Sequence, residues 1–409
     1  MTPLLRNSSV IAVRAILVCG CLAGMWWSAK TAMADSLFRQ DTPESVRQAI
    51  RLLPDEPAYY MRLALLDGGR ARQLLETATQ LDRYNAPAFI ELALRLEADG
   101  DQAGSEALLF DAFQVDRTYL PRWSLANFYL RHNDLPHFWF WAKRAAEMPP
   151  EDMSALFQLC WRVNPDGEAI AKSVLTDDPA TIRQYLRFLL NKGEARSVSA
   201  VAPRLIMRGT VETDRPLLLA TVNRLLADGD AVSSTALWRS LIARHWVVAD
   251  ETTPNNATFS RPPLPVAFDW SLSSREGLRS WPGPSGLEVE FSGSEPEDCE
   301  VTEQIVHLTP GDYDLLSKYL TTDIAPGTGL RWQILDARSN VQLAASSDLS
   351  SPTMRTVSTE FTVPAAMPLI RLRLRYQRAV GTARISGMLV VLSAIIRQHD
   401  AKPQVHSLS

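Results

Sequence analysis

Two tryptophans in the second half of the chain are candidates for binding a sugar ring. Trp281 is followed by Pro-Gly-Pro, which favours a loop, and an exposed ring on a loop is available to a ligand. Trp270 is the second aromatic candidate. Trp332 alternates with Leu330 and Ile334, so we expect its ring in a core. Trp281 and Trp270 therefore predict carbohydrate binding by aromatic stacking.

Three arginines form the second set of candidate ligand-binding residues. Arg371, Arg373 and Arg375 alternate with apolar residues, so their side chains project from one face of a strand. Such a row could bind an anionic polysaccharide, because each guanidinium donates several hydrogen bonds. The alternative is a solvated strand face, or a charged edge that prevents pairing with another chain.

The sequence contains no pattern for catalysis or for a bound metal. It lacks H-E-x-x-H, a P-loop, G-x-S-x-G and C-x-x-C. His132 and His137 lie five residues apart across an expected turn, which is a poor spacing for a shared metal. The acidic residues from Glu288 to Glu303 are interpreted as a solvated face rather than as calcium ligands. We therefore predict no catalytic residues, no metal and no cofactor, and a protein that is not an enzyme.

The elements that must position these residues begin with an internal repeat. Segments 81–89 and 115–123 lie 34 residues apart and match at an aspartate, a proline and an aromatic residue. A period of 34 indicates a helix–turn–helix unit that buries its apolar face by stacking on its neighbours.

This repeat resembles the tetratricopeptide repeat. The resemblance implies an N-terminal all-α helical solenoid that binds a protein partner. The expected units cover residues 57–78, 87–116, 121–145, 179–202 and 216–246, with turns at Gly100-Asp101, Asn133-Asp134, 192–194 and 228–230. It also implies that Asn127, and Arg131 one turn later, face a groove that holds an extended peptide.

A change of composition separates the two halves of the chain. Residues 251–266 are rich in proline, which cannot continue a helix, and are predicted to form a linker. From residue 267 the apolar residues recur with a period of two, and turn signals separate the runs. Strands are expected at residues 287–291, 305–308, 313–320, 330–335, 361–363, 370–376 and 385–392. Short strands without intervening helices indicate a β-sandwich or barrel.

The second half resembles jelly-roll carbohydrate-binding modules and their galactose-binding-like relatives. The matching stretches are 308–313, 330–334, 361–364 and 371–376. The resemblance implies a C-terminal all-β jelly-roll sandwich. The same fold also serves as an inert structural module, so it does not by itself establish sugar binding.

The N-terminus predicts export. Two arginines precede an apolar run of 13 residues from Ala15 to Trp27, and a small-x-small sequence ends at Ala34. This pattern is typical of a secretory signal peptide, and we predict cleavage after Ala34. The alternatives are an inner-membrane anchor formed by residues 10–29 and a lipid anchor on Cys21. The expected segments are thus a signal peptide or anchor (1–34), helical repeats (35–250), a linker (251–266), a sandwich (267–398) and a flexible tail (399–409).

Two cysteines remain if this segment is removed. Cys160 and Cys299 lie in different expected domains and form no disulfide framework. We interpret them as two buried thiols, with a single interdomain bridge as the alternative in an oxidising compartment.

Composition and pattern together predict a binding function. A net charge of −4 argues against a nucleic-acid binder, which needs a basic surface to replace counterions. We expect an exported binding or scaffold protein of the periplasm or cell envelope, with a protein partner on the repeats. The sandwich would bind carbohydrate or dock on an envelope assembly, and exopolysaccharide export is a plausible setting by resemblance. The alternatives are a carbohydrate-active enzyme with an accessory sandwich and a purely structural envelope protein.

Overall fold

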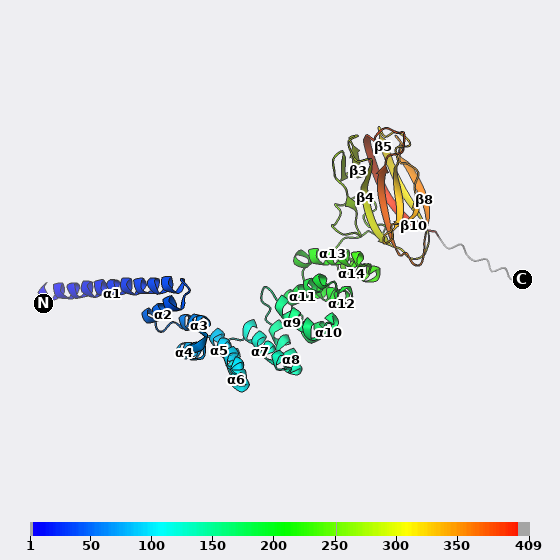
Figure 1. The fold of residues 1–409 in the computed structure, drawn as a ribbon. Coiled ribbons are helices and arrows are strands. Elements are labelled where there is room, and N and C mark those ends of the chain that lie inside the picture. Colours follow the sequence, from blue (N-terminus) through cyan, green and yellow to red (C-terminus); the bar gives the residue numbers. More distant parts are fainter. Residues whose placement is uncertain (1–2, 251, 400–409) are drawn as a thin grey trace. The chain divides into compact units, whose positions relative to one another are not determined.

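The computed structural model describes residues 3–250 and 252–399, with side chains from residue 17 onward. The described chain divides into two compact units. One contains the residues up to 165 together with 169–176, and the other contains 166–168 and the residues from 177 onward. The first unit is helical, and in the second unit helices precede strands (Figure 1). The predicted fold class, helical repeats followed by an all-β sandwich, is confirmed.

The first unit is a series of helices, most of them paired as antiparallel hairpins. Its described helices are α1 (Pro3–Phe38), α2 (Pro43–Leu52), α3 (Pro57–Leu66), α4 (Ala71–Leu81), α5 (Ala86–Ala98), α6 (Gln102–Val115), α7 (Tyr119–Arg131), α8 (Leu135–Ala146), α9 (Ser154–Val163) and, at the division between the units, α10 (Gly167–Ser173). Helices α3 with α4, α5 with α6 and α7 with α8 form the three predicted hairpins of this unit.

Two turns between the paired helices share one pattern: a residue in the left-handed conformation followed by an aspartate that caps the next helix. The turn from α5 to α6 needs a left-handed residue, and Gly100 supplies it with φ +89°. The turn from α7 to α8 uses Asn133 at φ +57°, a conformation that asparagine tolerates better than most residues. The aspartate that follows each of them caps the next helix: Asp101 accepts from the Gly104 amide and Asp134 from the His137 amide. These local signals explain why the turns could be predicted from the sequence.

The end of α1 packs on the helices that follow it. Ala34 is fully buried, and Leu37 and Phe38 pack in the same cluster with residues of α2 and α3. The Tyr59 hydroxyl donates a hydrogen bond to Asp35. Among the residues whose side chains are described, no helix has the length and apolar composition needed to cross a membrane. Cleavage after Ala34 and the anchor over 10–29 both stay predictions, and the side chains of residues 10–16 lie outside the described part.

Two further hairpins open the second unit, and both were predicted. They consist of α11 (Pro179–Lys192) with α12 (Ala195–Arg208) and α13 (Val211–Ala227) with α14 (Ala231–Ala243). A buried ion pair joins the two hairpins: Arg183 of α11 donates to Asp214 of α13, whose carboxylate is fully buried. Asp214 also accepts from the Thr210 amide at the start of its own helix.

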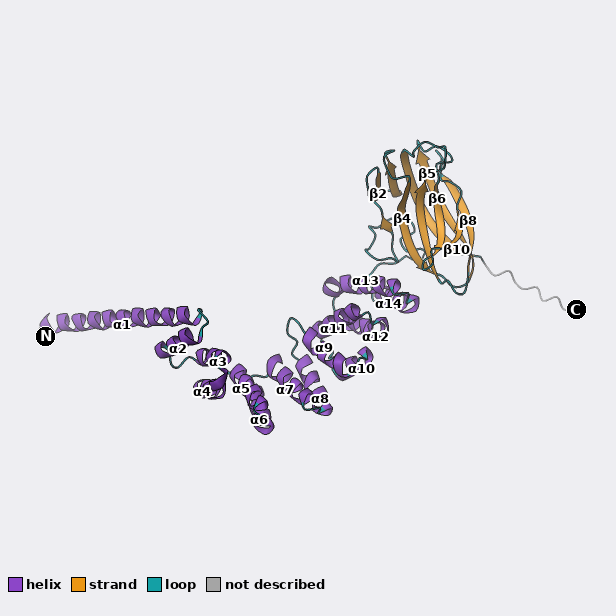
Figure 2. Cartoon of the chain, in the orientation of Figure 1, coloured by secondary structure: helices purple, strands orange, loops and turns teal. Residues whose placement is uncertain are grey.

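The sandwich is made of two antiparallel sheets (Figure 2). Its described strands are β1 (Ser271–Leu272), β2 (Leu278–Gly283), β3 (Gly286–Phe291), β4 (Asp298–His307), β5 (Gly311–Thr322), β6 (Leu330–Asp336), β7 (Gln342–Ala345), β8 (Arg355–Val363), β9 (Leu369–Gln377) and β10 (Gly387–Gln398). One sheet has the order β1-β4-β9-β6-β7 and the other β2-β3-β10-β5-β8. Alternate side chains of both sheets fill one core, which contains Trp332 as expected.

The predicted linker is part of the sandwich, which corrects the assignment of residues 251–266. Phe259 is 2% exposed and belongs to the core of the sandwich. The backbone beside it pairs with β10, since Ala394 N–H donates to the Ala257 carbonyl and Ile396 N–H to that of Thr253. Proline content predicted the end of the helices correctly, but the segment then binds along a strand instead of connecting two domains freely. Apart from His399, the predicted tail lies outside the described residues.

Candidate functional site

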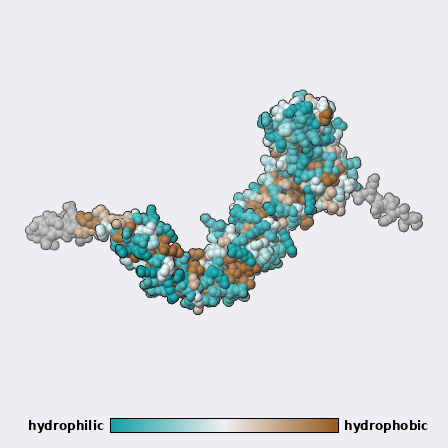
Figure 3. All heavy atoms as spheres, viewed as in Figure 1, coloured by the Kyte–Doolittle hydropathy of each residue, from teal (hydrophilic) through white to brown (hydrophobic). Residues whose placement is uncertain are grey.

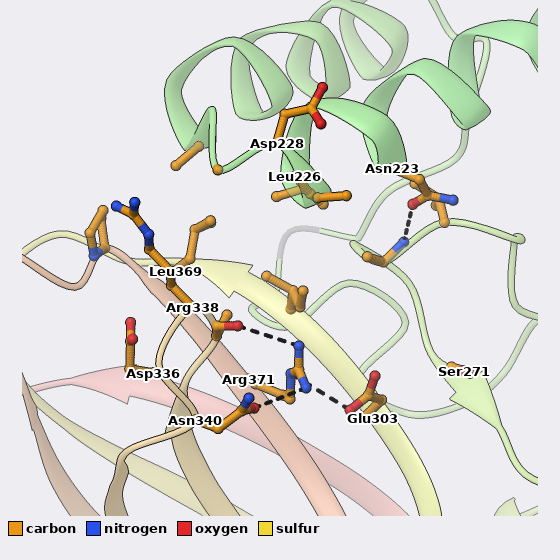
Figure 4. A pocket seen from close by; sticks show the side chains of 18 of the residues that line it. Asn223, Leu226, Asp228, Ser271, Glu303, Asp336, Arg338, Asn340, Leu369 and Arg371 are labelled. Atoms are coloured by element: carbon orange, nitrogen blue, oxygen red, sulfur yellow. Dashed lines mark hydrogen bonds and ion pairs between the residues drawn. The ribbon is translucent and has the colours of Figure 1, made fainter. Parts of the chain in front are cut away.

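A large cleft lies within the second unit, between the α13–α14 hairpin and one sheet of the sandwich. Its volume is about 1350 Å³. The sheet side is formed by β4, β9 and the β6–β7 turn, and the remaining wall by the segment from Pro263 to Leu272. Figure 4 shows Arg371 between Asn340 and Glu303 on the sheet side, with Asn223 and Leu226 on the helical side. Polar side chains thus converge on a space that is also lined by proline and leucine.

The cleft is held open by hydrogen bonds that fix its walls. Asn223 of α13 binds the neighbouring segment twice: its amide donates to the Pro265 carbonyl and its oxygen accepts from the Ala267 amide. On the sheet side, Asp336 accepts from both the amide and the hydroxyl of Ser339, which closes the turn after β6. That turn carries Arg338, which is exposed.

Arg371 forms the floor of the cleft. Its guanidinium donates to the Asn340 side chain at 3.1 Å and to the Ala337 carbonyl at 3.4 Å, and it lies 3.7 Å from Glu303. These contacts tie β9 to the β6–β7 turn on one side and to β4 on the other. The predicted residue Arg371 is therefore in the site, where both of its terminal nitrogens already have hydrogen-bond partners and its buried Nε has none.

The row of arginines continues from the cleft along the outer face of the sheet. Arg373 bridges Glu300 at 3.1 Å and Glu303 at 3.2 Å. Arg375 makes a two-pronged ion pair with Asp298. A second hollow of about 370 Å³ lies over Arg373 and Arg375, so hollows adjoin both ends of this row. We call the three arginines and the three carboxylates of β4 the charge ladder.

The charge ladder is electrically balanced. Hydrogen bonding to Asp298 raises the pKa of Arg375, which stabilises the charged guanidinium. Burial, together with the neighbouring charge of Glu303, raises the pKa of Glu300. Each of the three arginines of the ladder has a carboxylate partner, whereas Arg331 of β6, which lies opposite Arg375 on the neighbouring strand, has none among the described ion pairs. These pairings leave the three arginines less free to bind an anionic ligand, and the binding of an anionic polysaccharide by this row stays a prediction.

Trp270 is a core residue, which corrects its assignment as a sugar-stacking ring. Its side chain is 1% exposed, and its indole N–H donates to the Asn256 carbonyl. The ring packs between Phe259 and Trp332, at centroid distances of 4.8 Å and 5.9 Å. Burial of the packed segment around Asn256, which the proline-rich sequence concealed, explains the difference.

Trp281 is half-buried and lies in an edge strand, not in the predicted loop. It stands in β2, where the following proline is tolerated because an edge strand leaves some amides unpaired. Its indole N–H donates to Glu288, and the Arg279 guanidinium lies 5.6 Å from the ring centroid. A sugar would therefore have to use the remaining face of the ring or displace Arg279.

The two residues predicted to bind a peptide are already engaged. The Asn127 amide donates to the Trp123 carbonyl of its own helix. Arg131 makes a two-pronged ion pair with Glu97, the residue 34 positions earlier, and this pairing lowers the pKa of Glu97. A peptide carboxylate at Arg131 would have to compete with Glu97, so these residues do not form a free clamp. Their role in binding stays a prediction.

One of the two predicted thiols, Cys299, lines the hollow over Arg373 and Arg375. Cys160 and Cys299 are buried free thiols, one in each unit, as the sequence predicted. Burial raises the pKa of Cys160 to about 12 and that of Cys299 to about 11. Within the described residues, no three metal-ligating side chains are grouped closely enough to hold an ion.

Comparison with known proteins gives only remote likenesses. No protein-family model and no curated protein matches the sequence. The structure of YrrB, a TPR protein with an unusual peptide-binding site, is 12% identical, with a TM-score of 0.24, over 50% of this chain and 93% of that one. A CBM4 structure is 12% identical, with a TM-score of 0.29, over 36% of this chain and 100% of that one. PilF of Pseudomonas aeruginosa is 14% identical, with a TM-score of 0.25, over 53% and 90%. At these values we take no ligand or partner from any of them.

Proposed function

We propose that the chain is a non-enzymatic scaffold whose sandwich binds an uncharged polysaccharide along the charge ladder and the adjoining cleft. The helical repeats would bind a protein partner. Together, the two activities would hold a sugar chain beside a protein. The observation that carries this proposal is the balanced row of arginines and carboxylates that leads from one hollow into the other.

A balanced row suits a neutral, hydroxyl-rich ligand. A sugar hydroxyl both donates and accepts hydrogen bonds, and the ladder offers guanidinium donors beside carboxylate acceptors. An anionic chain would meet the carboxylates of β4, and a cationic chain would meet the arginines. From Arg371 to Arg375 the strand rises about 13 Å, and the cleft extends the site beyond that row.

The same carboxylates do not support the enzyme alternative. Glycoside hydrolysis uses two carboxyl groups about 5–9 Å apart on either side of the bond that is cut. Glu300 and Glu303 instead both bind Arg373, at 3.1 Å and 3.2 Å, and burial together with the charge of Glu303 raises the pKa of Glu300. Both carboxylates are held by one guanidinium on the same face of the sheet, rather than on opposite sides of a bound sugar.

The cellular setting of the proposal comes from the sequence. The N-terminal pattern supports an exported protein of the periplasm or envelope, with an inner-membrane anchor at residues 10–29 as the alternative. Assembly or export of an exopolysaccharide is the setting that fits a scaffold with a sugar-binding sandwich. A purely structural envelope protein is the remaining alternative.

Affinity electrophoresis of the whole chain in gels that contain neutral or anionic polysaccharides tests this function. We expect retardation by at least one neutral polymer and at least a fivefold loss of affinity in Arg373→Gln. Arg279→Gln, on the outer face of the other sheet, is the matched control and should bind normally. Melting temperatures of both variants distinguish loss of the site from loss of the fold.

Three outcomes would contradict the proposal. Retardation by anionic polymers alone would restore the original interpretation of the arginine row. Loss of binding in Trp281→Ala, with Arg373→Gln unaffected, would move the sugar site to β2, where a half-exposed ring lies beside Glu288 and Arg279. Binding of none of the polymers would leave the structural alternative.

A further inference from the structure

An aromatic groove lies on the first unit, between the second helices of two consecutive hairpins. Phe110 and Phe113 of α6 form one side and Phe140 and Trp141 of α8 the other, and the volume is about 660 Å³. Tyr129 of α7 also contributes to the lining. Figure 3 shows apolar residues gathered on the surface of the helical repeats. The groove lies along α8, whereas the predicted peptide clamp lies on α7.

The rings of the groove form a preorganised surface. Trp141 meets Phe110, Phe113 and Phe140 edge-on, at centroid distances of 5.8, 5.0 and 5.3 Å. Trp141 is 5% exposed, whereas Phe140 is 50% exposed and Phe110 is 37% exposed. A buried ring thus forms the floor and exposed rings form the rims. Exposed phenylalanines that face one another across a groove indicate an interaction surface.

The two ends of the groove carry opposite charge. At the start of α8, His137 is paired with Asp134, and Tyr129 donates its hydroxyl to Glu106. Among the described ion pairs, neither Asp134 nor Glu106 has an arginine or lysine partner. At the other end of α8, Lys143, Arg144 and Arg122 outnumber Glu147, the carboxylate they share in part. A complementary ligand carries a basic group at the first end and an acidic group at the second.

We infer that this groove binds a proline-rich segment of a partner protein, flanked by one basic and one acidic residue. Grooves lined with aromatic side chains recognise polyproline II segments, whose rigid form loses little entropy on binding. From Pro136 to Arg144 the helix rises about 12 Å, which matches about four residues of polyproline II. The inference rests on the proposed protein-binding role of the repeats and names the chemistry of the partner.

The lining favours proline over a helical ligand. A helix is about 10 Å wide with its side chains and packs against a broad aliphatic surface. Five of the eight described lining residues of this groove are phenylalanine, tyrosine or tryptophan, and the other three are a proline, a histidine and an arginine. Aromatic rings packed edge-on leave narrow gaps between flat surfaces. Such gaps fit the pyrrolidine ring of proline better than the branched side chain of leucine.

Fluorescence anisotropy with labelled peptides tests the inference on the full chain. The probe is a peptide of four consecutive prolines between an aspartate and a lysine. A second peptide replaces the prolines with glycine, a third replaces the two charged residues with glutamine, and a fourth is an amphipathic helix of leucine and lysine. We expect the first peptide to bind at least tenfold more tightly than the glycine and helical peptides, and the glutamine peptide to be weaker than the first.

Phe140→Ala should weaken the first peptide about tenfold, because an exposed aromatic rim residue is removed. Tyr84→Ala is the matched control, since Tyr84 is 82% exposed and lies outside the groove, and it should bind normally. No binding of the first peptide, equal binding of the glycine peptide, tighter binding of the helix, or insensitivity to Phe140→Ala would each overturn the inference. Polysaccharide binding by the sandwich is measured separately, by affinity electrophoresis. Failure of the peptide to bind is therefore distinguishable from failure of the proposed sugar binding.

Discussion

At the scale of single residues, burial controls the chemistry of the thiols. Cys160 and Cys299 are both packed in cores, and their raised pKa values keep them protonated at neutral pH. The thiolate is the reactive form, so a buried and protonated thiol reacts slowly. Cys19 and Cys21, by contrast, are exposed on α1. The reactivity of thiols therefore reports on both the cores and the N-terminal segment.

We predict that the exported chain, treated with a thiol reagent at pH 8, shows almost no reactive thiol when folded and two when unfolded. That count requires removal of residues 1–34, which contain Cys19 and Cys21. A retained N-terminal segment gives two reactive thiols in the folded chain and four after unfolding. Fast reaction of Cys160 or Cys299 in the folded chain, located by peptide mapping, would contradict the burial described here.

At the scale of elements, a buried ion pair joins consecutive hairpins. Asp214 of α13 is fully buried against Arg183 of α11. Removing one partner of a buried pair leaves the other uncompensated and typically costs 3–5 kcal/mol. We predict that Asp214→Asn lowers the free energy of unfolding by about 3 kcal/mol, measured in urea. Asp177→Asn is the control, because Asp177 is 65% exposed and its ion pairs should contribute less than about 1 kcal/mol. Equal effects of the two variants would show that burial does not govern this pair.

The segment before β1 is tested by a second pair of variants. Phe259 lies in the sandwich core, and removing a buried phenylalanine costs about 3–5 kcal/mol. Phe259→Ala should therefore lower the melting temperature of the sandwich, followed by near-ultraviolet circular dichroism. Ser260→Ala, at the exposed neighbour, should leave the transition in place. An unchanged transition in Phe259→Ala would support the free linker that the prolines predicted.

Elements with strong local signals could be predicted, and elements that depend on distant partners could not. The helical hairpins carry their turn residues with them, as at Gly100 and Asn133. Strand β9 alternates so regularly that its residues were assigned correctly. Strand β2 was missed because its proline is acceptable only at the edge of a sheet, and that position depends on the order of the strands. The arginine row was identified, but its carboxylate partners come from another strand, about 70 residues away in the sequence.

At the scale of the whole molecule, the candidate site could not be predicted without knowledge of the fold. Asn223 comes from a helix, Glu303 and Arg371 from two strands, and Asn340 from a turn, so no sequence pattern connects them. In the proposed function these contacts favour an uncharged chain over an anionic one, since each of the three arginines of the ladder is paired with a carboxylate. The central claim is thus that the sandwich binds sugar through a balanced surface.

The salt dependence of polysaccharide binding tests that claim most directly. Isothermal titration of the whole chain with a neutral polymer that it retains, at 50 and 500 mM NaCl, gives the two affinities. Because a neutral ligand releases no counterions, we predict that they agree to within about twofold. An anionic polymer that binds more tightly than the neutral one at 50 mM NaCl, and loses tenfold or more of its affinity at 500 mM, would mean that the arginines act as free cations and would contradict the balanced ladder.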